Sequence, residues 1–472
     1  MALAATLFRF GSPSCKPNNA PPAVAAASNG VLAFNRSSSW YVTYVNAFIS
    51  FPVARKNATS HLNFNLTVIV DVRVLCVTMS PSPCRTCRSK ATASREAMAE
   101  AGRRRERKSA ADEETNEIEW PSYLTPERLG VLSEMEPWVE DHVLPLLKPV
   151  EASWQPTDML PDPATLGADG FHAACLDLRA AAEGVSDELL VCLVANMVTE
   201  EALPTYPSGF NRFKVVRDAT GADATAWARW IRGWSAEENR HGDVLNRYMH
   251  LSGRFDMREV ERTVQRLIRD GMSFHGPVSS PFHGFVYVTF QERATAISHG
   301  NMARLVGARG SGDAALARIC GTVAADEKRH EAAYTRIMGK LFEADPDASV
   351  RAMAYTMRHR VEMPTAYIND GRHSVGDFYA RFIAIAEQAG TYTISDYRSI
   401  LEHLIQQWGV EDLAEGLSGE GRQARDYLCA LPHKIKRMEE KVIDRAAKAQ
   451  NKTPTAIPIN WIFDRTITVV LP

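Results

Sequence analysis

AEENRH at residues 236–241 recurs, with two substitutions, as ADEKRH at residues 325–330. Both hexapeptides keep Ala, Glu, Arg and His at the same places, and both contain Glu-x-x-His. None of the other histidines in the chain has a Glu three residues before it. Either hexapeptide alone is typical of a charged, solvated helix face. Two matching copies indicate an internal repeat of a helical hairpin.

The spacing within each hexapeptide is typical of a metal site. Residues three apart lie on one face of a helix, so the Glu238 carboxylate and the His241 imidazole can reach one ion. The same holds for Glu327 and His330. Imidazole together with carboxylate is a donor set that suits iron with open coordination positions.

A bundle that binds two irons also needs one Glu from each of two further helices. One candidate precedes each hexapeptide. Glu200 or Glu201 ends an apolar segment, and helical periodicity does not choose between them. Glu292 lies within a second apolar segment, where an acid is costly unless it is paired or bound to metal. The order Glu, Glu-x-x-His, Glu, Glu-x-x-His is therefore complete.

The fold class predicted from these patterns is all-α: a ferritin-like di-iron helical bundle with additional helices and a short C-terminal β-hairpin. Apolar residues recur at helical spacing in six long segments, and alternation near the C-terminus predicts the hairpin at residues 459–471. The helical segments are residues 187–202, 223–251, 257–272, 285–306, 313–342 and 347–363.

Three regions are expected along the chain. Residues 1–95 are rich in Ser, Ala, Asn and Arg, with Asp71 as their one acid, which predicts an organellar transit peptide or unstructured extension. Residues 96–120 form a charged linker, and residues 121–472 form the di-iron domain. Within residues 1–95, a β-prone, apolar stretch at residues 41–79 is assigned no fold.

Composition excludes several classes of protein. The chain beyond residue 95 is net acidic, which disfavours nucleic-acid binding. No run of about 20 apolar residues predicts a membrane span. The eight cysteines are scattered and suggest no disulfide framework, as expected in a reducing compartment.

Residues 121–465 resemble the plant plastid soluble acyl-[acyl carrier protein] desaturases, the stearoyl desaturase-like family. The resemblance rests on long strings in the family's order: TEEALPTY at 199–206, FQERAT at 290–295, SHGN at 298–301 and WIFDR at 461–465. It implies that Glu200, rather than Glu201, is the ligand. The implied set for two Fe(2+) ions is Glu200, Glu238, His241, Glu292, Glu327 and His330.

The resemblance also implies an activity. Such a protein inserts a cis double bond into a saturated acyl chain on acyl carrier protein, in fatty acid biosynthesis. It uses O2 and two electrons from reduced ferredoxin. It would act as a homodimer in the plastid stroma, with no nucleic-acid or membrane partner.

Four further residues have two interpretations each. Thr295 is a candidate for handling oxygen or an ordinary helix threonine. Asp326 either orients a ligand histidine or is a surface acid. Trp154 and Trp234 either lie on an electron path or belong to the core.

The chain departs from the common stearoyl type at Phe210, Phe213 and His283. A bulky ring in the acyl tunnel predicts a changed chain length, a changed bond position, or both. Docking of an acidic carrier protein needs basic residues at the tunnel mouth. The candidates are Lys434, Lys436, Arg437, Arg212 and Lys214.

Alternative functions stay open at this point. One is another di-iron oxidase, such as a hydroxylase or a radical-forming protein. The other is a non-catalytic or divergent di-iron bundle protein, a paralogue with altered substrate or lost turnover.

Overall fold

The computed structural model describes residues 28–36, 39–49, 68–76, 125–213, 215–272, 280–307, 312–448 and 454–469. The chain divides into two units, residues 1–107 and 108–472, and each is described by itself.

The first unit contains three strands, β1 (Ser28–Arg36), β2 (Ser39–Ile49) and β3 (Val68–Cys76). They pair antiparallel in the order β1-β2-β3. The β-prone stretch at residues 41–79 contains most of β2 and all of β3. The assignment of residues 1–95 to a transit peptide stays a prediction, and the linker at 96–120 lies outside the described residues.

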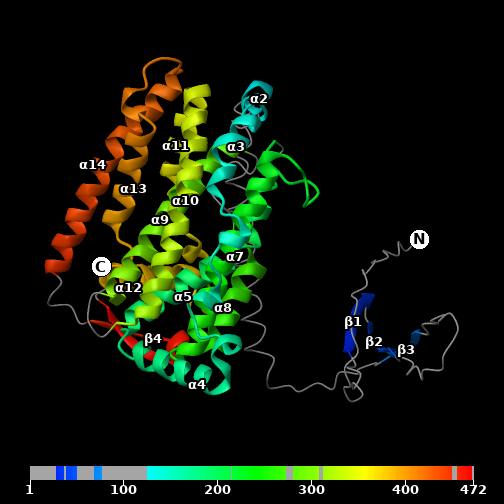
Figure 1. The fold of residues 1–472 in the computed structure, drawn as a ribbon. Helices are drawn as coiled ribbons and strands as arrows, with labels where there is room; N and C mark the ends of the chain where they lie inside the picture. The colour runs from blue at the N-terminus through cyan, green and yellow to red at the C-terminus, as the bar shows by residue number, and fades with distance from the viewer. Residues whose placement is uncertain are drawn as a thin grey trace, which may run out of the picture. The chain divides into compact units, whose positions relative to one another are not determined.

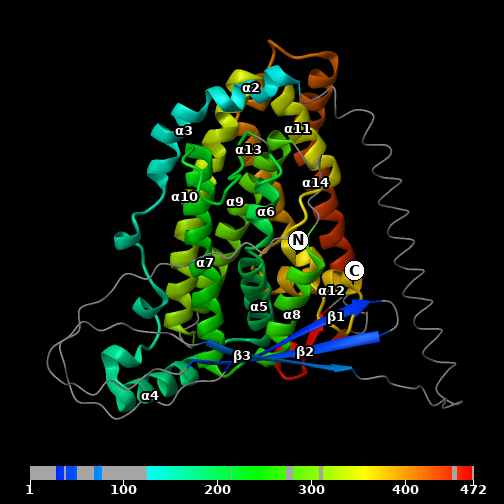
Figure 2. The same ribbon diagram turned by 90° about the vertical axis from the view of Figure 1, so that its right-hand side faces the viewer.

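The second unit is a helical bundle (Figures 1 and 2). Long helices α7, α9 and α10 run side by side, α5 packs on α7, and α11, α13 and α14 lie together on one flank. This confirms the predicted all-α architecture. The helices are α2 (Pro126–Glu134), α3 (Glu136–His142), α4 (Pro163–Ala182), α5 (Asp187–Glu201), α6 (Thr205–Phe210), α7 (Ala226–Ser252), α8 (Met257–Asp270), α9 (Pro281–Gly307), α10 (Ala314–Ala344), α11 (Pro346–His359), α12 (Val375–Ala389), α13 (Ile394–Gln407) and α14 (Gly419–Lys448).

Side-chain caps fix where the long helices begin. Thr225 accepts a hydrogen bond from Ala228 N at the start of α7, so this helix begins after Asp223 rather than at it. Asp313 caps α10 and also accepts a hydrogen bond from the Tyr248 hydroxyl. Such caps satisfy backbone N–H groups that the helix leaves unpaired.

Helix α11 differs from the prediction at both ends. It begins at Pro346 with Asp345 as its cap, and it ends at His359 rather than near residue 363. The cause of the early end is Arg360, whose φ is 62° and ψ is 143°. This is a left-handed conformation that residues with a side chain rarely adopt.

The predicted C-terminal hairpin is present, although it begins at residue 455 rather than 459. Strands β4 (Thr455–Ile459) and β5 (Arg465–Val469) pair antiparallel. Between them, Trp461 is fully buried and donates its indole N–H to Thr263 Oγ1 at 2.9 Å. The hairpin is thereby fixed to α8.

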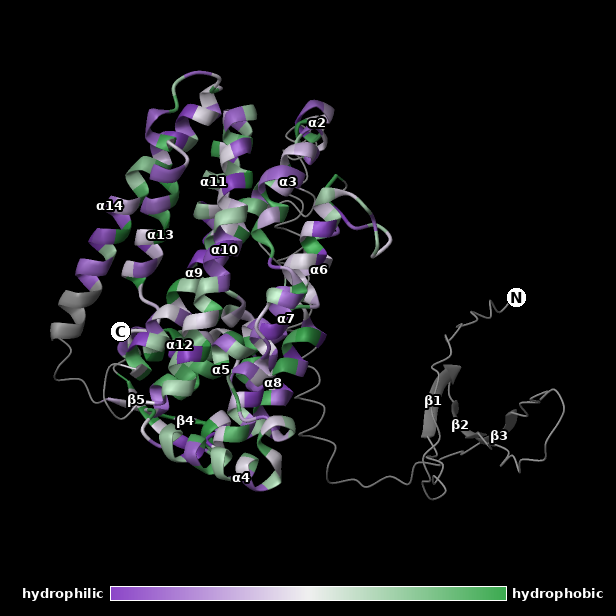
Figure 3. Cartoon of the chain, viewed as in Figure 1, coloured by the Kyte–Doolittle hydropathy of each residue, from purple (hydrophilic) through white to green (hydrophobic). Residues whose placement is uncertain are grey.

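Hydrophobic and hydrophilic residues are mixed along α13 and α14, as expected of helices with one buried face (Figure 3). Across the described residues, no helix is both long enough and apolar enough to cross a membrane.

Candidate metal centre

Four helices bring the six predicted ligands together in the middle of the bundle. Helix α5 supplies Glu200 and α9 supplies Glu292, while α7 and α10 each supply one Glu-x-x-His pair. All six side chains are buried. The adjacent Glu201 is only half-buried and belongs to no ligand cluster.

The six residues form two overlapping groups, and within each group the candidate donor atoms all lie within 4.8 Å of one another. One group is Glu200, Glu238, His241 and Glu327, and the other is Glu238, Glu292, Glu327 and His330. Glu238 and Glu327 belong to both. The geometry therefore offers two neighbouring positions for metal ions with two carboxylates between them.

Both imidazoles present Nδ1 to the carboxylates. His241 Nδ1 lies 3.0 Å from Glu238 Oε2 and 3.0 Å from Glu327 Oε1. His330 Nδ1 lies 2.6 Å from Glu238 Oε1. Each histidine is three residues after a glutamate, so one helix turn produces this convergence.

The acid at the second position of each hexapeptide faces the histidine of the other one. Glu237 Oε2 lies 3.0 Å from His330 Nε2, and Asp326 Oδ2 lies 3.6 Å from His241 Nε2. The structure therefore favours the orienting role for Asp326 over a surface acid, because its side chain is 0 % exposed. Carboxylates in this position fix the ring orientation of a metal-binding histidine.

The two acids that face the histidines, Glu237 and Asp326, share two partner residues. The backbone N–H of Lys148 donates to Glu237 Oε1 at 2.7 Å, and its ammonium donates to Asp326 Oδ1 at 2.9 Å. Arg329 donates to both carboxylates at 2.6 Å. Trp154 adds an indole N–H to Asp326 Oδ2 at 2.8 Å. These contacts offset the cost of burying two further acids.

Glu237 was not singled out by the sequence analysis. Its signal was present, because it holds the same place in its hexapeptide as Asp326 does in the other.

The ionisation of the cluster shows how crowded its charges are. Burial raises the pKa of Glu200 and of Glu292, and neighbouring carboxylates raise it further. Burial also opposes ionisation of Glu238, but the charges of His241 and His330 hold its pKa well below the usual range. Despite burial, contacts led by Glu238 raise the pKa of both histidines. Four acids with two bases form a charge pattern that metal cations compensate.

Unpaired atoms in the centre also fit metal ligation. Within the described residues, Glu238 Oε1, Glu327 Oε1 and His330 Nδ1 are buried and have no hydrogen bond of acceptable geometry. Buried polar atoms are normally satisfied. Here all three residues belong to one group whose candidate donor atoms lie within 4.8 Å of one another, as expected of donors to a metal.

Two residues from outside the hexapeptides contact the lone glutamates. His299 Nε2 lies 3.1 Å from Glu200 Oε1, and Trp234 Nε1 donates to Glu292 Oε1 at 3.1 Å. Burial lowers the pKa of His299 to about 3, so its ring is neutral where it contacts Glu200. His299 was quoted in the sequence analysis only as part of a string, and its role could not be read from local spacing.

Thr295 lies at the edge of the centre. Its hydroxyl oxygen is 2.6 Å from Glu327 Oε2 and 2.9 Å from Glu292 O. A hydroxyl has one hydrogen, so it donates to one of these oxygens at a time. Thr295 also lines the cavity described next, so it touches both the cluster and the space beside it.

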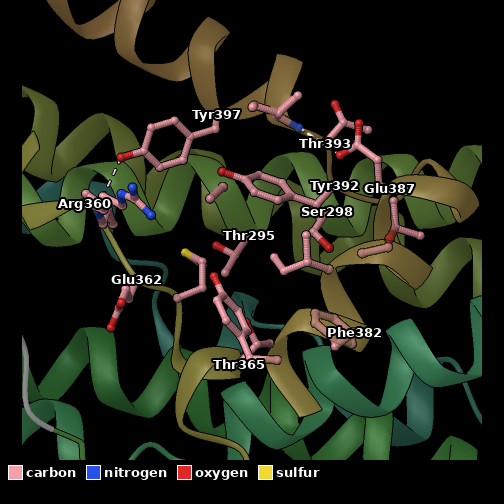
Figure 4. A pocket seen from close by; sticks show the side chains of 18 of the residues that line it. Thr295, Ser298, Arg360, Glu362, Thr365, Phe382, Glu387, Tyr392, Thr393 and Tyr397 are labelled. Carbon is pink, nitrogen blue, oxygen red and sulfur yellow. Dashed lines mark hydrogen bonds between the residues drawn. The ribbon is translucent and has the colours of Figure 1, made fainter. Parts of the chain in front are cut away.

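A cavity of about 650 Å³ reaches the cluster from one side. Thr199, Glu200 and Thr295 line its inner end. Figure 4 shows Thr295, Ser298 and Phe382 around this cavity, with Arg360 and Tyr397 at its left edge. Most of its wall is apolar, which suits a hydrocarbon ligand.

Phe210 and Phe213 do not line this cavity. Phe210 stacks on Tyr334 and meets Trp234 edge-on, with ring centroids 5.9 and 5.7 Å apart. Phe213 covers Gly284 so closely that a Cβ there would lie 2.5 Å from the Phe213 ring. We call Phe210, Phe213, Trp234, Phe285 and Tyr334 the aromatic block. It fills the space next to Glu292, whereas the cavity adjoins Glu200.

His283, the third departure noted in the sequence, is also buried outside the cavity lining. Its Nδ1 lies 2.7 Å from Ser280 Oγ. Its location gives no reason to link it with the substrate.

The sequence of this chain is similar to those of known proteins. The fatty acid desaturase family model matches residues 127–463. Acyl-[acyl-carrier-protein] desaturase 6, chloroplastic, from Oryza sativa subsp. japonica is 70% identical over 363 residues, covering 77% of this chain and 86% of that protein. Acyl-[acyl-carrier-protein] desaturase 7, chloroplastic, from Oryza sativa subsp. indica is 64% identical over 406 residues, covering 84% and 98%.

A more distant relative is stearoyl-[acyl-carrier-protein] 9-desaturase 2, chloroplastic, from Arabidopsis thaliana. It is 50% identical over 344 residues, covering 73% of this chain and 82% of that protein. The family match spans the helices that carry all six clustered residues. This chain therefore belongs to the fatty acid desaturase family.

Proposed function

We propose that this protein is a plastid acyl-[acyl carrier protein] desaturase that inserts a cis double bond into a saturated acyl chain. Its relatives carry that activity and a chloroplast location in their names. The observation that carries the proposal is the pair of overlapping carboxylate–histidine groups at the inner end of an apolar cavity. The proposed electron donor is ferredoxin, and the proposed assembly is a homodimer.

The metal in this proposal is iron, as two Fe(2+) ions. Glu200 and His241 would serve one ion and Glu292 and His330 the other, with Glu238 and Glu327 shared. Carboxylate and imidazole donors without thiolate favour iron over softer metals. When bound, the iron pair supplies the activation of O2 and the removal of two hydrogens from neighbouring methylenes.

The protein's own contribution is positioning and exclusion of water. The apolar wall holds the acyl chain, while Thr199, Glu200 and Thr295 limit how far it passes the cluster. Thr295 would hold a proton at its Oγ1, between Glu327 and the cavity. This is the basis for retaining Thr295 as a candidate for handling oxygen.

The aromatic block suggests a restricted substrate. Because its rings fill the space next to Glu292, few carbons can extend past the cluster on that side. Each buried methylene is worth about 0.8 kcal/mol, so two carbons without room change preference by roughly 15-fold. We propose a preference for shorter chains, or for a bond nearer the methyl end, relative to the stearoyl ninth-carbon standard.

Product analysis tests the proposal directly. Purified protein would be supplied with ferredoxin, O2 and acyl carrier proteins bearing chains of several lengths, and products would be identified by mass spectrometry. We expect one cis-monounsaturated product and about two irons per chain by elemental analysis. Iron binding without any product would instead support the non-catalytic alternative.

A further inference from the structure

Three tryptophans follow one another along a single face of α7. Trp227, Trp230 and Trp234 are separated by three and four residues, so their side chains share that face. All three are among the largest fully buried side chains that the structure describes. Trp234 lies one turn before the ligand Glu238, and Trp227 lies about 10 Å farther along the helix axis. We call these three residues the tryptophan row, and it leads away from the metal centre.

The inner end of the tryptophan row contacts the metal centre. Trp234 donates its indole N–H to Glu292 Oε1 at 3.1 Å, so one indole is hydrogen-bonded to a proposed ligand. Tyr334 connects Trp234 with Trp230, because its ring meets both indoles edge-on, with ring centroids 6.0 and 5.6 Å apart. The contacts from the carboxylate to the second indole are therefore continuous.

The outer end of the row lies beneath a surface helix. Trp227 donates its indole N–H to Leu132 O at 3.1 Å. Leu132 is the one buried residue of α2, and the two residues that follow it, Ser133 and Glu134, are exposed. Trp227 also stacks on Phe285, with ring centroids 5.6 Å apart. The row thus extends from the metal centre to a helix that faces solvent.

Packing alone does not explain why these rings carry polar atoms. Trp230 Nε1 and Tyr334 Oη are buried, and neither has a hydrogen bond of acceptable geometry. A buried polar group without a partner lowers stability, and phenylalanine would fill much of the same space without that cost. Indole and phenol rings differ from phenylalanine in another property, because they lose an electron far more readily. The row therefore has the composition of an electron-transfer chain.

The tryptophan row and the substrate cavity lie on different sides of the metal centre. The cavity adjoins Glu200, and the part of its lining that the structure describes contains no tryptophan. The row adjoins Glu292 instead. An electron can therefore reach the centre through the row without crossing the space for the acyl chain.

We infer that Trp227, Trp230 and Trp234 carry electrons from the protein surface to the oxidised metal centre when no acyl chain is bound, and so protect the centre from oxidising its own ligands. The inference rests on the proposed function, because O2 activated at the iron pair is the oxidant. A centre that has reacted with O2 and finds no methylene to oxidise would otherwise attack the side chains around it.

Reduction of O2 to two molecules of water consumes four electrons and four protons. In desaturation, two electrons come from ferredoxin and two come from the C–H bonds of the acyl chain. Without an acyl chain, the last two would come one at a time from a one-electron donor in solution, such as ascorbate, while protons come from solvent. Each indole that loses an electron inward regains one from outside, so the row is unchanged. The Tyr334 phenol keeps its proton, because burial raises its pKa well above the ordinary value.

The first test looks for the oxidised indole. Reduced, iron-loaded protein would be mixed with O2 without acyl substrate or ascorbate, frozen, and measured by electron paramagnetic resonance. We expect a tryptophan radical whose signal narrows when the chain contains indole-deuterated tryptophan. Its yield per oxidised iron should fall several-fold in Trp234→Phe. The matched control is Trp461→Phe, which replaces an equally buried indole in the C-terminal hairpin and should keep the wild-type yield.

The absence of any tryptophan radical in the wild type would overturn the inference. An equal fall in Trp234→Phe and Trp461→Phe would also overturn it, because the signal would then not depend on the row.

A second test addresses the outer part of the row. Trp230→Phe and Trp227→Phe lie outside the ligand groups and the cavity lining, so desaturation of a bound acyl chain should continue. Ascorbate should reduce the radical at Trp234 several-fold more slowly in either variant than in the wild type. Melting temperatures identify a variant that does not fold, and the other one then carries the test. Unchanged reduction rates in folded variants contradict an electron path through these indoles.

The third test measures protection. The protein would be incubated in air with reduced ferredoxin and ascorbate but no acyl substrate. Trp230→Phe should lose its iron several-fold faster than the wild type, and mass spectrometry should find more oxidation in the peptides that carry His241 and His330. Equal damage in both proteins would leave the row with a packing role only. If the wild type binds no iron and makes no unsaturated product, the proposed function itself fails, whereas product without a radical removes only this inference.

Discussion

The two helix pairs of the metal centre, α5–α7 and α9–α10, are alike in their ligands and unlike in their surroundings. Each supplies one lone glutamate and one Glu-x-x-His pair. Beyond that, Glu200 adjoins an open cavity and contacts His299, whereas Glu292 adjoins the aromatic block and accepts from Trp234. The repeat therefore accounts for the cluster, and the departures from the repeat account for the side on which a ligand can lie.

Substitution of Glu238 and Glu327, the two carboxylates that both groups share, should have the largest effect. Glu238→Gln or Glu327→Gln removes a donor from both groups, so we expect both irons to be lost and turnover to fall more than about 1,000-fold. Glu200→Gln removes a donor from one group only and should retain about one iron per chain. The measurement is elemental analysis alongside desaturation rate.

Glu201→Gln is the matched control, because this residue neighbours Glu200 in sequence but lies outside both groups. It should keep two irons and near-normal rate. Equal iron loss in Glu201→Gln and Glu200→Gln would contradict the assignment of the cluster.

The supporting acids should differ in importance. Asp326→Asn leaves Lys148 and Arg240 without the buried anion that both contact. Arg329 keeps one acidic partner in either variant, Glu237 or Asp326. We expect iron affinity or activity to fall about 100-fold for Asp326→Asn and about 10-fold for Glu237→Gln, the range typical of such contacts. Iron retention against a chelator measures the effect.

Length swaps sharpen this comparison. Asp326→Glu should restore more function than Asp326→Asn, because it keeps the anion. Glu237→Asp should lengthen the contact to His330 and lower iron retention modestly. If Asp326→Asn and Glu237→Gln both retain iron as well as the wild type does, the orienting role assigned to Asp326 and Glu237 is wrong.

The two sides of the cluster can be made more alike by opening the aromatic block. Phe213→Leu removes ring atoms above Gly284 and should shift preference toward chains two carbons longer, by up to roughly 15-fold. Palmitoyl and stearoyl carrier substrates assayed side by side measure the shift.

Gly284→Ala is the converse variant. Its Cβ would overpack against Phe213 and destabilise the fold by about 1–3 kcal/mol, while Phe213→Leu in the same chain should restore the melting temperature.

At the metal centre, the sequence predicted the repeated ligands and missed most contacts outside the repeat. Spacing within the hexapeptides identified four ligands, because one helix turn sets their geometry. The choice of Glu200 over Glu201 needed the family resemblance, since both lie near the same helix end. Glu200 is buried within the ligand cluster, whereas Glu201 is half-buried and lies outside it, and this difference now supplies a physical reason.

Residues that act across helices could not be predicted in the same way. His299 and Trp234 contact glutamates on other helices, and no local period encodes that. Phe210 and Phe213 were expected in the acyl tunnel, but their rings pack away from the cavity lining. The early end of α11 was missed because the polar run after residue 357 has no glycine or proline to mark it, although Arg360 takes a conformation typical of glycine.

The smallest expected effect concerns the outer neighbours of the lone glutamates. Trp234→Phe keeps the ring packing of the aromatic block and removes only the N–H that Glu292 accepts, so turnover should fall several-fold, in keeping with one hydrogen bond of about 1 kcal/mol. His299→Gln retains a side-chain donor and should stay closer to the wild type. His299→Leu, which removes the hydrogen-bond partner of Glu200, should match Trp234→Phe. If His299→Leu lowers turnover much more than Trp234→Phe does, then Glu200 depends on its contact with His299 more strongly than Glu292 depends on Trp234. The two lone glutamates would then differ in function as well as in surroundings.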